Sequence, residues 1–263
     1  MLIRKSISRA LAIIAVGFLT SCITTTTGGF LTDVSDERAI SDYVQLALAY
    51  YDAGDMIGAR RHVGNVMAID DNNSEIHMVL ALIFQREGDI DLADENFRRA
   101  IRLNGENSRA RNNYAVMLFS QERFPEAITQ LEQVVNNTDY EGRAVAFESL
   151  GRTALRVNRI SDAQRAFERA LQLNSNLYIA SLELALLHFG QQDFASARAV
   201  FQSYLTTAQF NDIPHSPRAL LAGIQIEGHF NNQKIVDDFT LILRTLFQSS
   251  PEYQAYQRLD DAL

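Results

Sequence analysis

The feature that most constrains this chain is a spacing of about 34 residues that recurs along most of its length. Small side chains follow this spacing in two registers twelve residues apart, with steps of 34, 34, 36, 34 and 38 residues. The period fits two short helices with their turns, so it indicates a stack of helix pairs. The first register holds Ala47, Ala81, Ala115, Gly151, Ala185 and Gly223, and the second holds Ala59, Ala93, Ala127, Ala163, Ala197 and Ile235.

This pattern is the signature of the tetratricopeptide repeat (TPR). We predict an all-α TPR superhelix (an α-solenoid) of about six helix-turn-helix repeats plus a C-terminal capping helix. The repeats are expected at about 40–73, 74–107, 108–141, 144–177, 178–211 and 216–249, within a TPR domain of residues 40–263. A large residue follows each second-register position by four and is expected in the core: Val63, Phe97, Leu131, Phe167, Phe201 and Phe239.

Local signals agree with these boundaries. Gly54, Gly88 and Asn158 stand where first helices should end. Ser74 and Ser108 are expected to cap the next helices. Extra residues fall near 136–143 and near 206–216, and we interpret both as tolerated insertions rather than devices that change the superhelical twist. The tail 252–263 is predicted to form the capping helix.

Residues 1–21 resemble a bacterial lipoprotein signal peptide. Arg4, Lys5 and Arg9 form a basic start, and the apolar run 11–19 is too short to span a bilayer as a stable helix. Leu19-Thr20-Ser21-Cys22 then resembles the lipobox, in which cleavage precedes the cysteine. The resemblance implies that Cys22, the only cysteine, carries a diacylglycerol and an acyl chain such as palmitate. Two or more chains would anchor the protein stably.

The residue after Cys22 is Ile23 rather than aspartate, which resembles the Gram-negative pattern sorted to the outer membrane. The implied location is lipid-anchored on the periplasmic face of the outer membrane. Residues 22–39 are predicted to be a flexible tether, because their Thr and Gly residues show no apolar periodicity. The signal has three basic and no acidic residues, so its removal changes the net charge from −8 to −11. An acidic chain of this kind argues against nucleic-acid binding.

The sequence shows no pattern typical of an enzyme. The five histidines show no metal-ligand spacing on one helix face, and no glycine loop lies between a strand and a helix. His188 falls at a core-facing position and is expected to be packed. We therefore expect no catalytic residues, metal, cofactor or small-molecule substrate.

The surface available for binding is the concave one, which TPR arrays line with the first helix of each pair. In the first three repeats these positions form an apolar stripe with a polar margin. Such a groove favours an amphipathic or extended apolar segment of a partner protein. The predicted groove consists of Val44, Leu48, Tyr51, Met78, Leu82, Gln85, Asn112, Val116 and Phe119.

Two interpretations of this stripe stay open. Leu48, Leu82 and Val116 either line a groove or only pack neighbouring first helices together, whereas Tyr51, Met78 and Phe119 favour the groove. Repeat 4 is different, because it places Glu148, Arg152 and Arg156 on its inner face. This polar band is one way to divide the concave surface into two binding zones, since repeat 5 is apolar again at Leu182, Leu186 and Phe189.

The mature chain is similar to the type IV pilus biogenesis lipoproteins called PilF or PilW, the TPR pilotins. The six-repeat layout after a lipobox carries the resemblance, together with three short stretches. These are Asn112-Asn113-Tyr114 leading to Phe124-Pro125-Glu126-Ala127, then Tyr140-Glu141-Gly142-Arg143 before Phe147-Glu148-Ser149-Leu150-Gly151, and finally Ser250-Pro251-Glu252-Tyr253-Gln254.

The resemblance implies a protein that binds subunits of the pilus secretin and promotes their localisation and multimerisation at the outer membrane. A lipid tether would raise the effective concentration of the groove near its partner. The alternative is a TPR lipoprotein scaffold of another envelope complex, for outer-membrane protein assembly or peptidoglycan synthesis. An enzyme or an enzyme's adaptor is a third hypothesis, which no constellation of residues favours.

Overall fold

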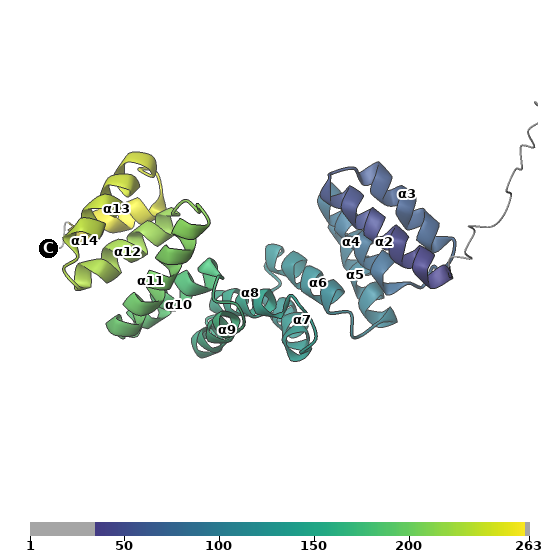
Figure 1. Cartoon of the computed structure of the whole chain (residues 1–263), viewed down its shortest axis with the longest axis horizontal. Helices are drawn as coiled ribbons and strands as arrows, with labels where there is room; N and C mark the ends of the chain where they lie inside the picture. The colour runs from purple at the N-terminus through teal and green to yellow at the C-terminus, as the bar shows by residue number, and fades with distance from the viewer. Residues whose placement is uncertain (1–34, 261–263) are drawn as a thin grey trace, which may run out of the picture.

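The computed structural model describes residues 35–260, which form helices and turns without strands (Figure 1). The helices follow one another as antiparallel pairs along an arc, and a single helix closes the C-terminal end. The predicted TPR superhelix with a capping helix is thus confirmed. The pairs are α2 (Asp36–Asp52) with α3 (Met56–Met67), α4 (Ser74–Glu87) with α5 (Ile90–Leu103), α6 (Ser108–Ser120) with α7 (Phe124–Asn136), α8 (Arg143–Arg156) with α9 (Ile160–Leu173), α10 (Tyr178–Gly190) with α11 (Phe194–Phe210), and α12 (Pro217–His229) with α13 (Gln233–Leu246), before α14 (Pro251–Asp260).

The small residues allow the two helices of each pair to approach closely, and the large residue on the second helix fills the space between them. Phe97, Phe167 and Phe201 are wholly buried. A Cβ atom at Gly151 would lie 2.6 Å from the Phe167 ring, which explains why the first register has glycine in that repeat. All six predicted core residues are buried.

The turns inside the helix pairs share one backbone feature. Gly54 and Gly88 end their helices with φ of +81° and +90°, and Asn158 does so with φ of +58°. Glu122 and Gln192 adopt the same left-handed conformation at the equivalent turns, with φ of +58° and +64°. The turn geometry therefore recurs in every repeat even where the residue type that favours it is absent.

The predicted caps are wrong by one residue. Asn73 and Asn107 are the N-caps of α4 and α6, and their amide oxygens accept hydrogen bonds from the N–H groups of Ile76 and Ala110. The Ser74 hydroxyl instead donates to the Ala100 carbonyl and accepts from the Asn107 amide, at 2.9 Å each. The serines thus connect the start of a repeat with its end, because the asparagines already satisfy the helix termini.

The boundary of the predicted tether is also wrong, since residues 36–39 are helical. Ser35 caps α2 by accepting a hydrogen bond from the Arg38 N–H, and Asp36 and Glu37 lie in the first turn, where negative charge is favoured. Cys22 and the rest of the proposed tether lie outside the described residues. No helix within residues 35–260 is long and apolar enough to cross a membrane.

The two irregular steps have different structural outcomes. The first lies in the loop between α7 and α8, where Tyr140 packs partly against the N-terminal core, the cluster of buried apolar residues within 44–146. The second mostly lengthens a helix, because α11 has 17 residues where α5 and α9 have 14. Tyr253 and Tyr256 of α14 pack against the C-terminal core, the cluster of buried apolar residues within 182–243, as expected of a capping helix.

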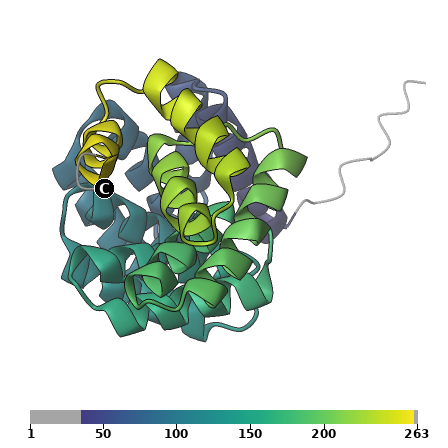
Figure 2. The ribbon, with the colours of Figure 1, turned by 90° about the vertical axis from the view of Figure 1, so that its left-hand side faces the viewer.

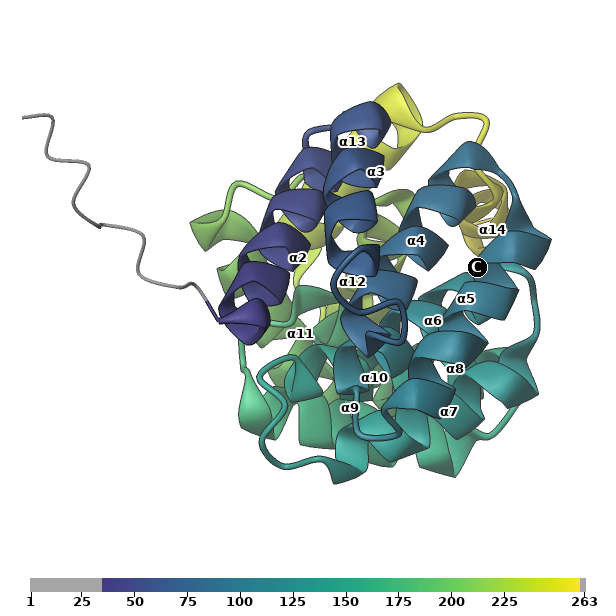
Figure 3. The ribbon, with the colours of Figure 1, turned by 90° about the vertical axis from the view of Figure 1, so that its right-hand side faces the viewer.

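The path of the helices leaves an inner and an outer side. In Figure 1 the arc places α6 and α8 on its inner side and α7 and α9 on its outer side. Seen from the two ends, the helices wind around a central axis (Figures 2 and 3). The first helices are also neighbours of one another, since α4 contacts α6 and α6 contacts α8.

Candidate partner-binding groove

The inner side of the arc has a hollow with apolar walls, between α6 and α8. We call it the inner hollow, and its volume is about 200 Å³. Val116 and Phe119 form its α6 wall, and Ser149 and Arg152 its α8 wall. The full lining is Ala115, Val116, Phe119, Ser120, Leu131, Ser149, Arg152 and Thr153.

Two predicted groove residues lie in the core instead. Met78 is wholly buried and Val44 is almost wholly buried, so the prediction that they line a groove is wrong. Met78 meets the next first helix rather than solvent, since the Asn113 amide lies 3.7 Å from its sulfur. The adaptable thioether of Met78 thus packs between neighbouring first helices.

The predicted residues of repeats 1 and 2 are only partly accessible. Leu48, Tyr51 and Leu82 are half-buried and pack against the N-terminal core, and Gln85 is half-buried as well. The Arg86 guanidinium covers the Tyr51 ring at 3.9 Å from its centroid and donates to the Tyr51 carbonyl. At this end of the array the stripe mainly joins neighbouring helices.

The predicted residues of repeat 3 are the ones that reach the inner hollow. Val116 is 50% exposed, and Phe119 is half-buried against Phe124 at a ring-centroid distance of 5.4 Å. Asn112 is half-buried one turn before Val116, and its amide oxygen has no hydrogen-bond partner within residues 35–260. The candidate site is therefore narrower than the predicted groove and lies nearer the middle of the chain.

Repeat 4 contributes two arginines of its polar band to this site. The guanidinium of Arg152 lies 5.5 Å from the Phe119 ring centroid, and that of Arg156 lies 5.6 Å from it and 4.5 Å from the Phe124 ring. Cation–π contacts of this kind hold two positive charges beside an apolar wall. The sequence placed these arginines on the inner face but gave no signal that they fold onto an aromatic residue of the previous repeat.

Glu148, the third residue of the polar band, has a structural role. Its side chain is buried and accepts a hydrogen bond from the Ala180 N–H at 3.0 Å. Ala180 lies in the first turn of α10, whose own cap residue Leu177 makes no side-chain bond. Burial raises the pKa of Glu148, and the Ala180 hydrogen bond and the nearby Arg152 charge oppose that rise. Glu148, on α8, therefore satisfies an N–H group at the start of α10 in the following repeat.

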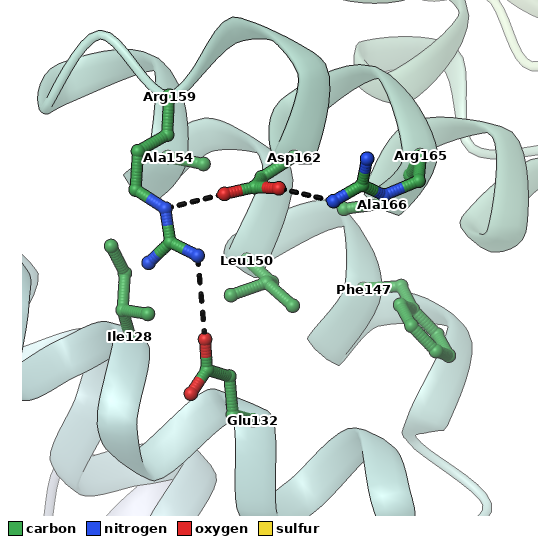
Figure 4. Close-up of a pocket in the computed structure, with 9 residues that line it drawn as sticks. All are labelled: Ile128, Glu132, Phe147, Leu150, Ala154, Arg159, Asp162, Arg165 and Ala166. Carbon is green, nitrogen blue, oxygen red and sulfur yellow. Dashed lines mark hydrogen bonds and ion pairs between the residues drawn. The ribbon is translucent and has the colours of Figure 1, made fainter.

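A second hollow lies on the outer side, between α7, α8 and α9, with a volume of about 240 Å³ (Figure 4). We call it the outer hollow. Its charged groups neutralise one another: Arg159 pairs with Asp162 at 2.5 Å and with Glu132 at 3.7 Å, and Arg165 also pairs with Asp162. Its lining is Ile128, Glu132, Phe147, Leu150, Ala154, Arg159, Asp162, Arg165 and Ala166.

No group of three or more metal-ligating side chains gathers anywhere in residues 35–260. The predicted position of His188 agrees with the structure, since its side chain is mostly buried, 3.7 Å from Asp193.

Comparison with known proteins relates the chain to pilus assembly factors. Residues 78–141 and 149–212 match the tetratricopeptide repeat family. The type IV pilus assembly protein PilF of Pseudomonas aeruginosa is 32% identical over 246 residues, which are 93% of this chain and 95% of PilF.

Solved structures agree with that relation. The structure of Pseudomonas aeruginosa PilF superposes with a TM-score of 0.79 at 30% identity and covers 85% of this chain and 98% of its own. The crystal structure of PilW, a type IV pilus biogenesis factor, shares the fold with a TM-score of 0.67 at 21% identity, covering 84% of this chain and 99% of PilW.

Proposed function

The chain belongs to the PilF family of TPR proteins, and on that premise we propose that it assists type IV pilus assembly by holding a segment of the pilus secretin in the inner hollow. The observation that carries the proposal is the pairing of a half-exposed Val116 with Phe119 on the inner side of a TPR array. Apolar surface left open on a scaffold of stacked helices is suited to an extended or helical segment of another protein.

The proposed location is the periplasmic face of the outer membrane, with Cys22 as the lipidated residue. It rests on the lipobox-like sequence before Cys22 and on Ile23 after it. Anchoring would confine the groove to the membrane where secretin subunits assemble, which raises their effective concentration without any new contact. Replacing Cys22 with serine is expected to abolish labelling by radioactive palmitate and to move the protein out of outer-membrane fractions. Labelling that survives the change would contradict this part of the proposal.

The binding proposal is tested by a Val116→Asp variant expressed in cells that lack the native gene. A carboxylate in the apolar wall should prevent docking, and heat-resistant secretin multimers in outer-membrane fractions should fall sharply. Leu92→Asp is the matched control, because Leu92 is 43% exposed but lies on α5, a second helix. Both proteins must be present at native levels for the comparison to count.

Normal multimers with Val116→Asp would refute the groove. Normal multimers in cells without any copy of the chain would refute the link to the secretin altogether, and pull-down from membranes would then identify the alternative envelope complex.

A further inference from the structure

We propose that the inner hollow selects a partner segment in which an apolar side chain stands next to an acidic one. The apolar side chain enters the hollow between Val116 and Phe119, and the neighbouring carboxylate pairs with the Arg152 guanidinium. This inference deepens the proposed function and rests on it, since the segment belongs to a partner protein.

The apolar part of the site fits one side chain rather than a whole helix. The hollow holds about 200 Å³ between α6 and α8. Val116 is half-exposed and Phe119 presents part of its ring. Thr153 keeps its hydroxyl bonded to the Ser149 carbonyl at 2.6 Å, so this wall places no free hydroxyl donor of Thr153 in the hollow. Burial of an aliphatic or aromatic side chain is therefore favoured.

The charged part of the site is Arg152. Among residues 35–260, no carboxylate forms an ion pair with it, whereas eight of the twenty arginines in this range, Arg156 among them, have such a partner. The acidic residue one turn before it, Glu148, directs its carboxylate to the Ala180 N–H. Arg156 is held by Glu122, but at 3.6 Å and with both side chains largely exposed. Such a surface pair is weak, so Arg156 can also turn to a ligand.

A comparison within the array shows that Arg152 is unusual. Tyr51 and Arg86 repeat the relation of Phe119 and Arg156, with an aromatic residue covered by an arginine of the next first helix. Arg86 donates one of its N–H groups to the Tyr51 carbonyl, whereas Arg152 makes no such hydrogen bond within residues 35–260. Within residues 35–260, the Phe119 ring is the one that two arginines approach, because Arg152 joins Arg156 there.

Charge complementarity decides the occupant. Two guanidinium groups beside a small apolar hollow disfavour basic segments and reward a carboxylate that forms a forked pair with Arg152. A segment with this composition also precedes the described residues, since Phe30-Leu31 is followed by Asp33. A partner segment is the proposed occupant, and the test must separate it from this internal competitor.

The test selects short random peptides from a display library on the full chain in detergent, and counter-selects on Val116→Asp. The expected result is enrichment of peptides with an aliphatic or aromatic residue beside Asp or Glu. The best peptide should bind Arg152→Gln about tenfold more weakly. Its twin with Gln or Asn in place of the acid should bind the native chain as weakly. Arg169→Gln is the matched control, because Arg169 is an exposed arginine of the same repeat on α9.

Three results would overturn the proposal. The first is that no peptide depends on Val116. The second is that Val116-dependent peptides show no excess of acidic residues, or bind Arg152→Gln and Arg169→Gln alike. The third is that peptides are enriched only after Phe30 and Leu31 are changed to serine, which would assign the hollow to this segment of the same chain or of a second copy. No secretin is present in this selection. The peptide preference can therefore be absent while the multimer assay supports the proposed function, and the peptide preference can be present while the multimer assay contradicts that function.

Discussion

The inner and outer hollows are of similar size and share the helix α8, yet they differ in what they leave unsatisfied. In the outer hollow, Arg159, Asp162 and Glu132 form a closed network of ion pairs. In the inner hollow, Arg152 lies on an aromatic ring without an acidic partner among residues 35–260, beside a half-exposed Val116. A concave surface therefore indicates a binding site where its charged and apolar groups lack partners within the protein. Where those groups have such partners, the surface has a structural role.

The sharpest way to break this comparison is to place the same charge on each side. Ile128 of the outer hollow is 5% exposed, so Ile128→Asp buries a carboxylate and should cost about 3 kcal/mol or more of unfolding free energy. Val116 is 50% exposed, so Val116→Asp should cost under ~1 kcal/mol. Urea unfolding of both variants measures the difference. Equal losses would mean that the inner wall is core as well.

The next effect concerns α8, which the two hollows share. Gly151→Ala should destabilise the chain by about 1–3 kcal/mol, because the new methyl group meets the Phe167 ring. Gly190→Ala is the control, since Gly190 lies at the end of α10 with nothing within 4 Å of an added Cβ. It should be neutral or slightly stabilising. Thermal unfolding followed by circular dichroism distinguishes the two, and an unaffected Gly151→Ala would contradict the packing described for this repeat.

Much of this arrangement was predictable from the chain. The spacing of small residues and the large residue four places on gave the helix pairs, the core and the capping helix, because packing between stacked hairpins constrains those positions directly. The exposure of the inner side was not predictable. Leu82 and Val116 occupy the same position of successive repeats, yet Leu82 is half-buried and Val116 is 50% exposed, so exposure here depends on the packing between neighbouring first helices and not on the repeat position alone.

The features that were not predicted have identifiable physical causes. The role of Arg152 depends on a contact across a repeat boundary, between α8 and Phe119 of α6, and sequence periodicity describes each repeat alone. The helical start at Asp36 was not predicted because the Thr- and Gly-rich stretch before it lacks apolar periodicity. Ser35 followed by two acidic residues was a usable capping signal. The lipidation of Cys22 stays a prediction.

A smaller effect is expected from the ion pairs of the outer hollow. Arg159→Ala should lower the unfolding free energy by under ~1 kcal/mol, since the Arg159 side chain is 47% exposed and its pairs are screened by water. Secretin multimers in cells should be unchanged. A strong loss of multimers in a folded Arg159→Ala variant would show that the outer side carries the function and would invert the comparison.

The smallest effect is a pH dependence at Glu148. Because burial raises the pKa of Glu148 above its ordinary 4.5, the folded state binds this proton more tightly than the unfolded state does. The stability that Glu148 contributes is therefore fully present below pH 4.5 and falls as pH rises through the raised pKa. Glu148→Gln keeps an acceptor for the Ala180 N–H but does not ionise. Its unfolding free energy relative to the native chain should increase with pH, and a difference that is constant between acidic and neutral pH would contradict this origin.

The most direct test of the central claim, that the inner side of the array does the binding, is photo-crosslinking in living cells. A photoreactive amino acid is placed at Val116 on the inner wall, or at Ile160, which is 38% exposed at the start of α9 on the outer side. We predict a crosslink to the pilus secretin from position 116 and none from position 160. A secretin crosslink from position 160 alone would contradict the account.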